Sequence, residues 1–224
     1  MKTTSRQTRI EREISKYVRI PAGDVQLLAD LHVPELAAGL VILAYDFGGS
    51  RNHPRTREVA SVMREAGFGT LLCDLLTESE ATVDEYRNDA EFLAKRLVAV
   101  TKWAASDSDT KRLPICYFGA CTGGAAVLIA AAKLDKKVKA IVSRGGRLEL
   151  AANYLQQVKC PTLLIVGERD KPAVTLNRES FDKLQCEKDL IIVPGASLLF
   201  GEPGKLGEMA KKSADWLRKH LARS

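Results

Sequence analysis

A cysteine flanked by glycines is the residue of this chain whose type and spacing best suit chemistry. Cys121 stands at the centre of Gly119-Ala120-Cys121-Thr122-Gly123. The pattern predicts a tight strand-to-helix turn, because a Cβ in place of either glycine would collide with the neighbouring strand or helix. Such a turn exposes the thiol at a helix N-terminus, which favours the thiolate, and it aims the N–H of Thr122 at a developing oxyanion. The alternative interpretation is a small-residue turn that contains a buried cysteine.

The composition argues against several classes of protein. With 224 residues, 46% of them hydrophobic, we expect a single α/β domain over 1–224 with a polar extension at 1–13. We find no signal peptide and no run of about 18 apolar residues, so no membrane partner is expected. The net charge of +6 is modest and its basic residues are interleaved with acids, which argues against nucleic-acid binding.

The five cysteines show neither paired spacing nor a metal-like cluster. An odd number of cysteines without a signal peptide predicts reduced thiols and a cytoplasmic protein. We therefore expect no metal and no organic cofactor.

Predicted strands and helices alternate along the chain. Strands are expected at 17–20, 25–31, 39–45, 70–73, 113–118, 138–143, 162–166 and 190–193, and helices at 54–66, 83–105, after Cys121, and at 204–221. This order predicts a mostly parallel central sheet of about eight strands, flanked by helices in three αβα layers. Ligands of such sheets bind beyond the carboxyl ends of the strands, where Cys121 is expected.

Two further loops are expected at the same edge. Asp170 follows the strand at 162–166, and the segment 194–200 follows the strand at 190–193. The order nucleophile, acid, histidine is that of α/β hydrolases, so a histidine is expected in the last loop. The chain has no histidine there.

These segments resemble α/β hydrolases of the dienelactone hydrolase type over nearly the whole chain. The resemblance rests on residues 119–124, 164–170 and 193–196. It implies that Cys121 is the nucleophile, that Asp170 is the acid, and that Leu198 stands at the position of the family's histidine. Because a leucine neither accepts nor returns a proton, the inherited triad is incomplete.

The segment Tyr45-Asp46-Phe47-Gly48 is similar to the loop of dienelactone hydrolase in which a glutamate approaches the resting cysteine. The resemblance implies that Asp46 faces Cys121 and that the N–H groups of Phe47 and Thr122 form the oxyanion hole. The alternative is that Asp46 is an ordinary aspartate in a surface turn.

The departures from the family pattern at Tyr45, Asp46, Phe47 and Leu198 are all expected around one pocket, whereas the scaffold motifs look ordinary. This concentration favours an engineered or computationally redesigned active site on a hydrolase scaffold. A natural, divergent member of the family is the alternative.

The three histidines and one arginine are further candidates. His53 precedes the helix at 54–66, so it either reaches the pocket mouth or is a plain surface residue at the helix start. His32 lies in a strand whose face the sequence leaves open. His220 is interpreted as structural, because a cation is favourable near a helix C-terminus. Arg144, at a strand end, is interpreted as a loop-anchoring ion-pair partner or else as a contact for an anionic substrate.

Two functions follow from these residues. In the first, the chain hydrolyses or transfers the acyl group of a small activated ester or lactone, with Cys121 attacking and Asp46 or His53 moving protons. Turnover would be weak or limited to a single round, because the family's histidine is absent. In the second, the pocket is an engineered binding or covalent-capture site, or hosts a different reaction such as proton abstraction by Asp46. The chain is expected to be a monomer or a homodimer.

Overall fold

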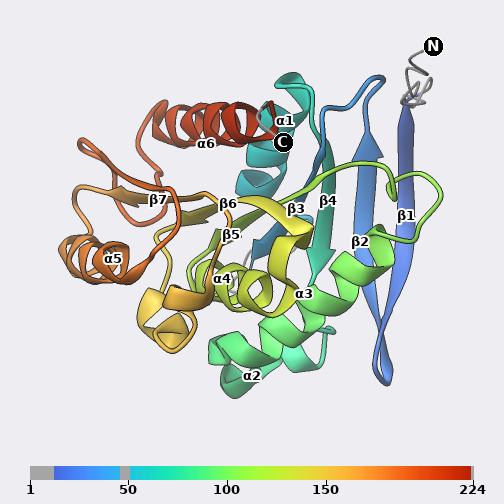
Figure 1. Ribbon diagram of the computed structural model, residues 1–224, viewed down its shortest axis with the longest axis horizontal. Coiled ribbons are helices and arrows are strands. Elements are labelled where there is room, and N and C mark those ends of the chain that lie inside the picture. Colours follow the sequence, from blue (N-terminus) through green and yellow to red (C-terminus); the bar gives the residue numbers. More distant parts are fainter. Residues whose placement is uncertain (1–12, 46–50, 223–224) are drawn as a thin grey trace, which may run out of the picture.

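The computed structural model describes residues 13–45 and 51–222, which form an eight-stranded sheet in the order β1-β2-β4-β3-β5-β6-β7-β8 (Figure 1). β1 is antiparallel to β2 and β2 is antiparallel to β4, whereas all other neighbouring strands are parallel. The strands are β1 (Ile14–Ala22), β2 (Val25–Val33), β3 (Leu40–Tyr45), β4 (Gly69–Asp74), β5 (Ile115–Ala120), β6 (Val138–Arg144), β7 (Thr162–Gly167) and β8 (Lys188–Val193). The predicted α/β-hydrolase fold is therefore confirmed.

Helices cover both faces of the sheet. They are α1 (Pro54–Glu65), α2 (Asp84–Asn88), α3 (Ala90–Ala104), α4 (Thr122–Leu134), α5 (Lys171–Lys183) and α6 (Lys205–Leu221), with 3₁₀ turns η1 (Glu80–Thr82), η2 (Asp135–Lys137), η3 (Leu148–Ala151) and η4 (Leu155–Gln157). The helices α1 and α6 pack on one face, and α3, α4 and α5 pack on the other. None of the helices in the described ranges is both long and apolar enough to span a bilayer.

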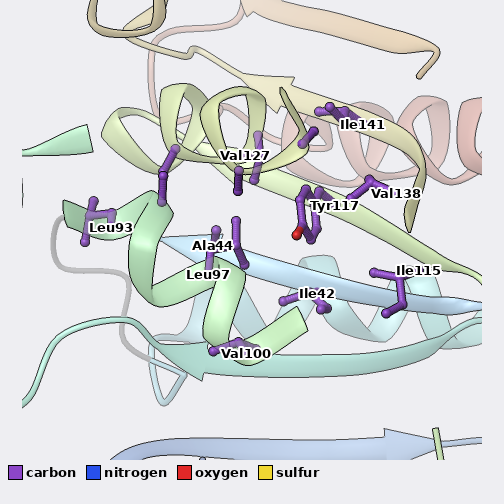
Figure 2. Packing of buried hydrophobic residues seen from close by; sticks show 14 of the residues in the cluster. Ile42, Ala44, Leu93, Leu97, Val100, Ile115, Tyr117, Val127, Val138 and Ile141 are labelled. Atoms are coloured by element: carbon purple, nitrogen blue, oxygen red, sulfur yellow. The ribbon is translucent and has the colours of Figure 1, made fainter. Parts of the chain in front are cut away.

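The core beneath α3 and α4 holds the central strands and the site in place. In Figure 2, Tyr117 of β5 lies beside Val127 of α4, and Leu97 of α3 packs toward Ala44 of β3. Nearly every residue of α4 is buried, since the helix is enclosed by the sheet, α3 and the segment that follows β6. A helix buried on almost all sides is held firmly, and so is the residue at its N-terminus.

The second core lies beneath α1 and α6, where Phe118 of β5 and Val142 of β6 meet Met63 and Leu217 of the two helices. Because both faces of the central strands are buried, these strands appear in the sequence as unbroken apolar runs.

The helix predicted over 83–105 is wrong in one respect, because it is interrupted. Asp89 adopts an extended conformation between α2 and α3, and its Oδ1 accepts the N–H of Phe92 at 2.9 Å. An aspartate that caps a helix in this way competes with continuation of the preceding helix. The closing helix likewise begins at Lys205, one residue late, because Gly204 has a φ of 77°.

Candidate active site

The strand-to-helix turn around Cys121 is as tight as the glycines predict. β5 ends at Ala120 and α4 begins at Thr122, which leaves Cys121 alone between them with φ 50° and ψ −121°. Non-glycine residues rarely adopt this conformation, which costs about 1–3 kcal/mol. A Cβ at Gly119 would collide with the carbonyl group of Gly123, so glycine is required on this side of the turn.

Glycine is required on the helix side as well. Gly123 faces the carbonyl group of Ala44 in β3, where a Cβ would collide with backbone. At Gly124 a Cβ would lie 2.6 Å from the Oγ of Ser143 and 2.7 Å from the Cα of Gly146. The absence of these Cβ atoms lets α4 approach β3 and β6 closely, which confirms the predicted role of the glycines.

The backbone of Cys121 is tied to the end of β6 at both of its polar groups. Its N–H donates to the carbonyl oxygen of Arg144 at 3.2 Å, and its carbonyl oxygen accepts the N–H groups of Gly124 and Arg147, each at 3.0 Å. The side chain is half-buried. These bonds hold the strained residue in place, so that its side chain projects from the N-terminus of α4.

Asp170 lies beyond the end of β7 and begins α5. Its Oδ1 accepts the N–H of Ala173 at 3.2 Å as a helix cap. The preceding N–H, of Arg169, donates to the carbonyl oxygen of Ala196 at 2.9 Å. The loops after β7 and β8 are thereby joined at the carboxyl edge of the sheet.

Leu198 lies in the second of these loops, against the residue that follows β6. Its Cδ1 is 3.2 Å from where a Cβ on Gly145 would stand, and Gly145 follows the Arg144 that binds Cys121. The side chain is 41% exposed. The structure thus brings Cys121, Asp170 and Leu198 to one edge of the sheet.

Tyr45 ends β3 on the same edge. Its ring lies 5.9 Å from the ring of Phe118, and its hydroxyl is buried without a hydrogen-bond partner among the residues that the structure describes. Burial raises the pKa of Tyr45, the nearby charge of Arg144 opposes the rise, and the thiol of Cys121 adds to it. Tyr45 is therefore protonated, and it lies near enough to Arg144 and Cys121 for their charges to affect its pKa.

Arg144 ends β6 and is only 6% exposed. Among residues 13–45 and 51–222, its Nε has no hydrogen-bond partner and no carboxylate forms an ion pair with it. The guanidinium carbon instead lies 5.9 Å from the ring centroid of Phe200. The predicted loop-anchoring ion pair is therefore not found within these residues. The contact between Arg144 and Phe200 could not be predicted from the sequence, because the two residues are far apart along the chain.

His53 is the N-cap residue of α1. Its Nδ1 accepts the N–H of Arg55 at 3.2 Å. A neutral imidazole whose Nδ1 accepts a hydrogen bond carries its proton on Nε2. In this arrangement neither ring nitrogen of His53 is open to accept a thiol proton, and the interpretation as a helix-start residue is favoured.

The other two histidines lie at the opposite edge of the sheet. His32 pairs with Thr70 near the start of β4, and its Nε2 lies 3.0 Å from Glu13. Its pKa is lowered, mainly by burial and secondarily by Arg64, against the opposing effect of Glu13. Neither its position nor its partner connects it to Cys121.

His220 is buried in the last turn of α6, with its ring centroid 4.2 Å from that of Trp216. The next residue, Leu221, contacts the segment that precedes β3, at the amino edge of the sheet. The interpretation of His220 as structural agrees with this position.

Asp46 and Phe47 lie outside the described residues, so their predicted places opposite Cys121 stay predictions. Thr122, the other predicted oxyanion-hole residue, is the buried first residue of α4. Its N–H follows the nucleophile position directly, as an elbow requires.

The remaining cysteines differ from Cys121 in their surroundings. Cys73, Cys116 and Cys160 are buried, and burial raises the pKa of Cys116 and of Cys160 to about 12. Cys186 is half-buried with its Sγ 3.7 Å from the Oγ1 of Thr162, and burial raises its pKa. Within 13–45 and 51–222 we find no group of three or more His, Cys, Asp or Glu side chains suited to a metal ion.

A pocket of about 700 Å³ lies over β1, β2 and the end of β4. Asp74, which ends β4 opposite Tyr45, lines it together with Arg51. Arg51 is held by Asp74 at 3.1 Å and by Asp30 at 2.8 Å. The pocket therefore has a fixed polar wall next to Tyr45.

Comparisons with known proteins identify the family and agree with the fold. The family model described as "Dienelactone hydrolase family" matches residues 29–220. A protein named "Putative phosphoribosyl transferase" from Mycobacterium tuberculosis is 47% identical over 204 residues, which are 91% of this chain and 46% of that protein. The chain thus spans about half the length of the curated relatives that it matches.

Among solved structures, the crystal structure of dienelactone hydrolase from Anabaena variabilis shares 44% sequence identity, with a TM-score of 0.90 over 94% of this chain and 99% of that chain. Est1E from Butyrivibrio proteoclasticus has a TM-score of 0.79 over 92% of this chain and 99% of its own, at 15% identity. The latter similarity shows the fold alone.

Proposed function

Because this chain belongs to the dienelactone hydrolase family, we propose that it is a hydrolase or acyl-transfer catalyst for activated esters or lactones, with Cys121 as its nucleophile. The observation that carries the proposal is the strained, glycine-supported conformation of Cys121 at the N-terminus of α4. A backbone strain of this kind, held by hydrogen bonds on both sides, is typical of functional positions.

The first chemical step needs little beyond this turn. The thiolate of Cys121 attacks the carbonyl carbon of the ester, and the N–H groups of Thr122 and Phe47 are proposed to stabilise the oxyanion. The bond to the leaving oxygen then breaks and the acyl group remains on sulfur. A leaving group such as a phenolate departs without being protonated, so this step requires no histidine.

The second step is where this chain departs from its family. Hydrolysis of the acyl thioester needs a base to activate water. Leu198 stands where the family carries histidine, and the chain's three histidines act as a helix cap or lie at the opposite edge. Asp46 is the remaining candidate base, with Asp170 near the position that it would otherwise orient. We therefore propose slow deacylation.

The name of the M. tuberculosis relatives does not extend to this chain, which covers 46% of their length and matches a hydrolase family. Both origins that the sequence suggested, a redesigned pocket on a hydrolase scaffold and a natural, divergent member of the family, stay predictions. A monomeric or homodimeric state, a small-molecule substrate and a cytoplasmic location stay predictions.

Leu198 also favours a second candidate function, covalent capture. An acyl group that cannot be removed would remain on Cys121, and the protein would then bind one equivalent of ligand and stop. Proton abstraction by Asp46 is a third possibility, which requires no acylation of Cys121 at all.

A stopped-flow experiment with a p-nitrophenyl ester distinguishes these functions. We expect a burst of one nitrophenolate per protein, a slower steady state, and an acylated Cys121 peptide in the mass spectrum. A burst without a steady state supports capture. The matched control is Cys121→Ala, and release at the same rate by this variant would overturn the proposal.

A further inference from the structure

The face of the sheet that carries α1 and α6 is open over β1. Side chains alternate along β1, so Ile14 and Ile20 are buried in the core on the α3 side, whereas Tyr17 points to the opposite face and is 78% exposed. The helix α1 packs on β3, β4 and α6. A cavity of about 300 Å³ lies between α1 and the open face of β1 and β2. It is remote from the elbow, because β5, which leads to Cys121, lies two strands beyond β4 (Figure 1).

The register of the strands arranges the floor of this cavity in two rows across β1, β2 and β4. In the first row, Ser15 pairs with His32 and His32 pairs with Thr70. The second row, formed in the same way, consists of Tyr17, Asp30 and Leu72. Residues two apart in a strand share a face, so both rows line the cavity.

Two arginines of α1 form the opposite wall. Arg57 and Arg64 are seven residues apart, which is two helical turns, so both project from the same side of α1. The Nη1 of Arg64 lies 3.5 Å from the Oγ1 of Thr70 in the first row. The Nη2 of Arg57 lies 3.8 Å from the Oδ2 of Asp30 in the second row. Each row therefore has one guanidinium above it.

The two rows differ in charge. In the second row, Asp30 is also bound by Arg51, at 2.8 Å. The first row offers hydroxyls and an imidazole, and among residues 13–45 and 51–222 no carboxylate forms an ion pair with Arg64. Glu13 stands at the rim with its side chain 65% exposed and its carboxylate 3.0 Å from the Nε2 of His32. The end of the cavity at Arg64 is therefore the end that suits an anion.

We propose that this cavity binds a phosphate monoester, with the phosphate at Arg64, His32 and Thr70. Guanidinium and hydroxyl groups donate hydrogen bonds to phosphoryl oxygens, and the phosphate supplies the counter-charge that Arg64 lacks within the described residues. The organic part would lie along the second row, where the ring of Tyr17 and the side chain of Leu72 offer apolar contacts. Free phosphate shares the phosphoryl chemistry but makes none of these apolar contacts. The proposal concerns a site away from the ester chemistry and does not depend on the proposed function.

Titration calorimetry with phenyl phosphate, inorganic phosphate and benzyl alcohol tests the proposal. Phenyl phosphate should bind most tightly, inorganic phosphate more weakly by roughly tenfold because it buries no apolar surface, and benzyl alcohol not at all. Arg64→Met should weaken the binding of phenyl phosphate by about tenfold to hundredfold, the usual loss for hydrogen bonds to a charged group. Thr70→Val should weaken it less, and Arg64→Lys should retain part of it. Equal affinities for phenyl phosphate and inorganic phosphate would overturn the assignment to a monoester.

Two further variants control for charge alone. Glu13→Gln should tighten binding, because it removes the acid at the rim that repels the phosphate. Arg178→Met removes an exposed arginine of α5 and should leave the affinity unchanged. The melting temperature of each variant without ligand shows that it is folded. An affinity that neither Arg64→Met nor Thr70→Val changes would overturn the proposal. Phenyl phosphate that suppresses the ester burst equally with and without Arg64 would place the ligand at Cys121 and overturn it as well.

The imidazole of His32 provides a spectroscopic readout. The charged groups around it are Glu13, Lys16, Asp30, Arg57 and Arg64, with Arg51, Asp107 and Asp109 bound to them. In the free protein, burial and the charge of Arg64 lower the pKa of His32, and Glu13 opposes them. Saturating phenyl phosphate should raise this pKa in an NMR titration, because an adjacent anion stabilises the imidazolium. The resonances of the other two histidines should not respond to the ligand. Binding that leaves the His32 titration unchanged would overturn the placement of the phosphate.

Discussion

The N–H of Cys121 donates a 3.2 Å hydrogen bond to the carbonyl oxygen of Arg144, so the nucleophile position and the buried cation share one backbone contact. The carbonyl of Cys121 in turn accepts the N–H of Arg147, three residues further along. The end of β6 and the segment that follows it therefore hold both backbone polar groups of the strained residue, while the last side chain of β6 lies against the ring of Phe200.

Close packing of α4 on this segment leads to a first prediction. Gly124→Ala should lower the free energy of unfolding by about 1–3 kcal/mol, since the new Cβ would press against Ser143 and Gly146. It should also displace Cys121 and reduce the ester burst. Urea unfolding and stopped-flow measurements test both effects.

Gly207→Ala is the matched control for this substitution. Gly207 lies in α6 with nothing within 4 Å of its Cβ position, so alanine there should stabilise the protein by roughly 0.5–1 kcal/mol through helix propensity. Equal effects of the two substitutions would contradict the argument from close packing.

The buried thiol of Cys116 leads to a second prediction, concerning alkaline pH. Burial raises the pKa of Cys116 from 9.0 to about 12. Between these values the unfolded chain has lost a proton that the folded chain retains, so stability is fully present below pH 9 and declines as the pH rises. One such thiol contributes about 1.4 kcal/mol per pH unit.

Urea unfolding at about pH 8 and about pH 10.5 measures this decline. The wild-type protein should lose about 2 kcal/mol more than Cys116→Ala over this interval, which covers about 1.5 units above the thiol's ordinary pKa. The comparison uses the difference between two pH values, so the cavity that alanine leaves cancels. An equal loss in both proteins would contradict the prediction.

The sequence predicted the sheet, the elbow and most of the flanking helices because each has a strong local cause, whereas helix α5 was not predicted. Apolar runs bounded by glycines mark buried strands, and the glycines around Cys121 are required by contacts with adjacent backbone. The interruption at Asp89 was missed, because a capping aspartate inside a helical pattern looks like an exposed helix residue until its side chain is seen on Phe92.

Contacts between loops that are distant along the chain could not be predicted from the sequence. Leu198 lies against Gly145, and Phe200 lies beneath Arg144. Both contacts depend on how the loops after β6 and β8 fold over one another. An ion pair was expected for Arg144 because arginines at strand ends commonly pair with nearby carboxylates. No such pair is found within the described residues, because the neighbours in space are aromatic.

The surroundings of the cysteines lead to a third prediction. Brief alkylation with substoichiometric iodoacetamide at about pH 7.5 should label Cys121 first, because thiols with a raised pKa are poor nucleophiles at that pH. Cys116 and Cys160 are buried, and Cys186 is half-buried with a raised pKa. Peptide mass spectrometry locates the label, and the urea-unfolded protein, in which all five cysteines should react, is the control. Preferential labelling of Cys186 would contradict the prediction.

The last prediction concerns the missing base. Leu198→His should raise steady-state ester turnover by roughly 10²–10⁴-fold, the usual contribution of a positioned general acid–base group. The gain should fall on deacylation, because in the proposed mechanism the thiolate of Cys121 attacks an activated ester without a base. Burst and steady-state rates on a p-nitrophenyl ester separate the two steps.

Leu199→His is the matched control, since Leu199 is the adjacent exposed leucine, at 44% against 41% for Leu198. It adds the same imidazole to the same loop at a position that the family pattern does not assign to the histidine, so its steady-state rate should stay near that of the wild type. The double substitution Leu198→His with Asp170→Asn tests the orienting acid, and it should remove most of the gain because an amide holds the imidazolium less well. If Leu198→His turns over no faster while a crystal structure shows its imidazole between Asp170 and Cys121, then an absent base does not limit this protein, and the slow step lies elsewhere.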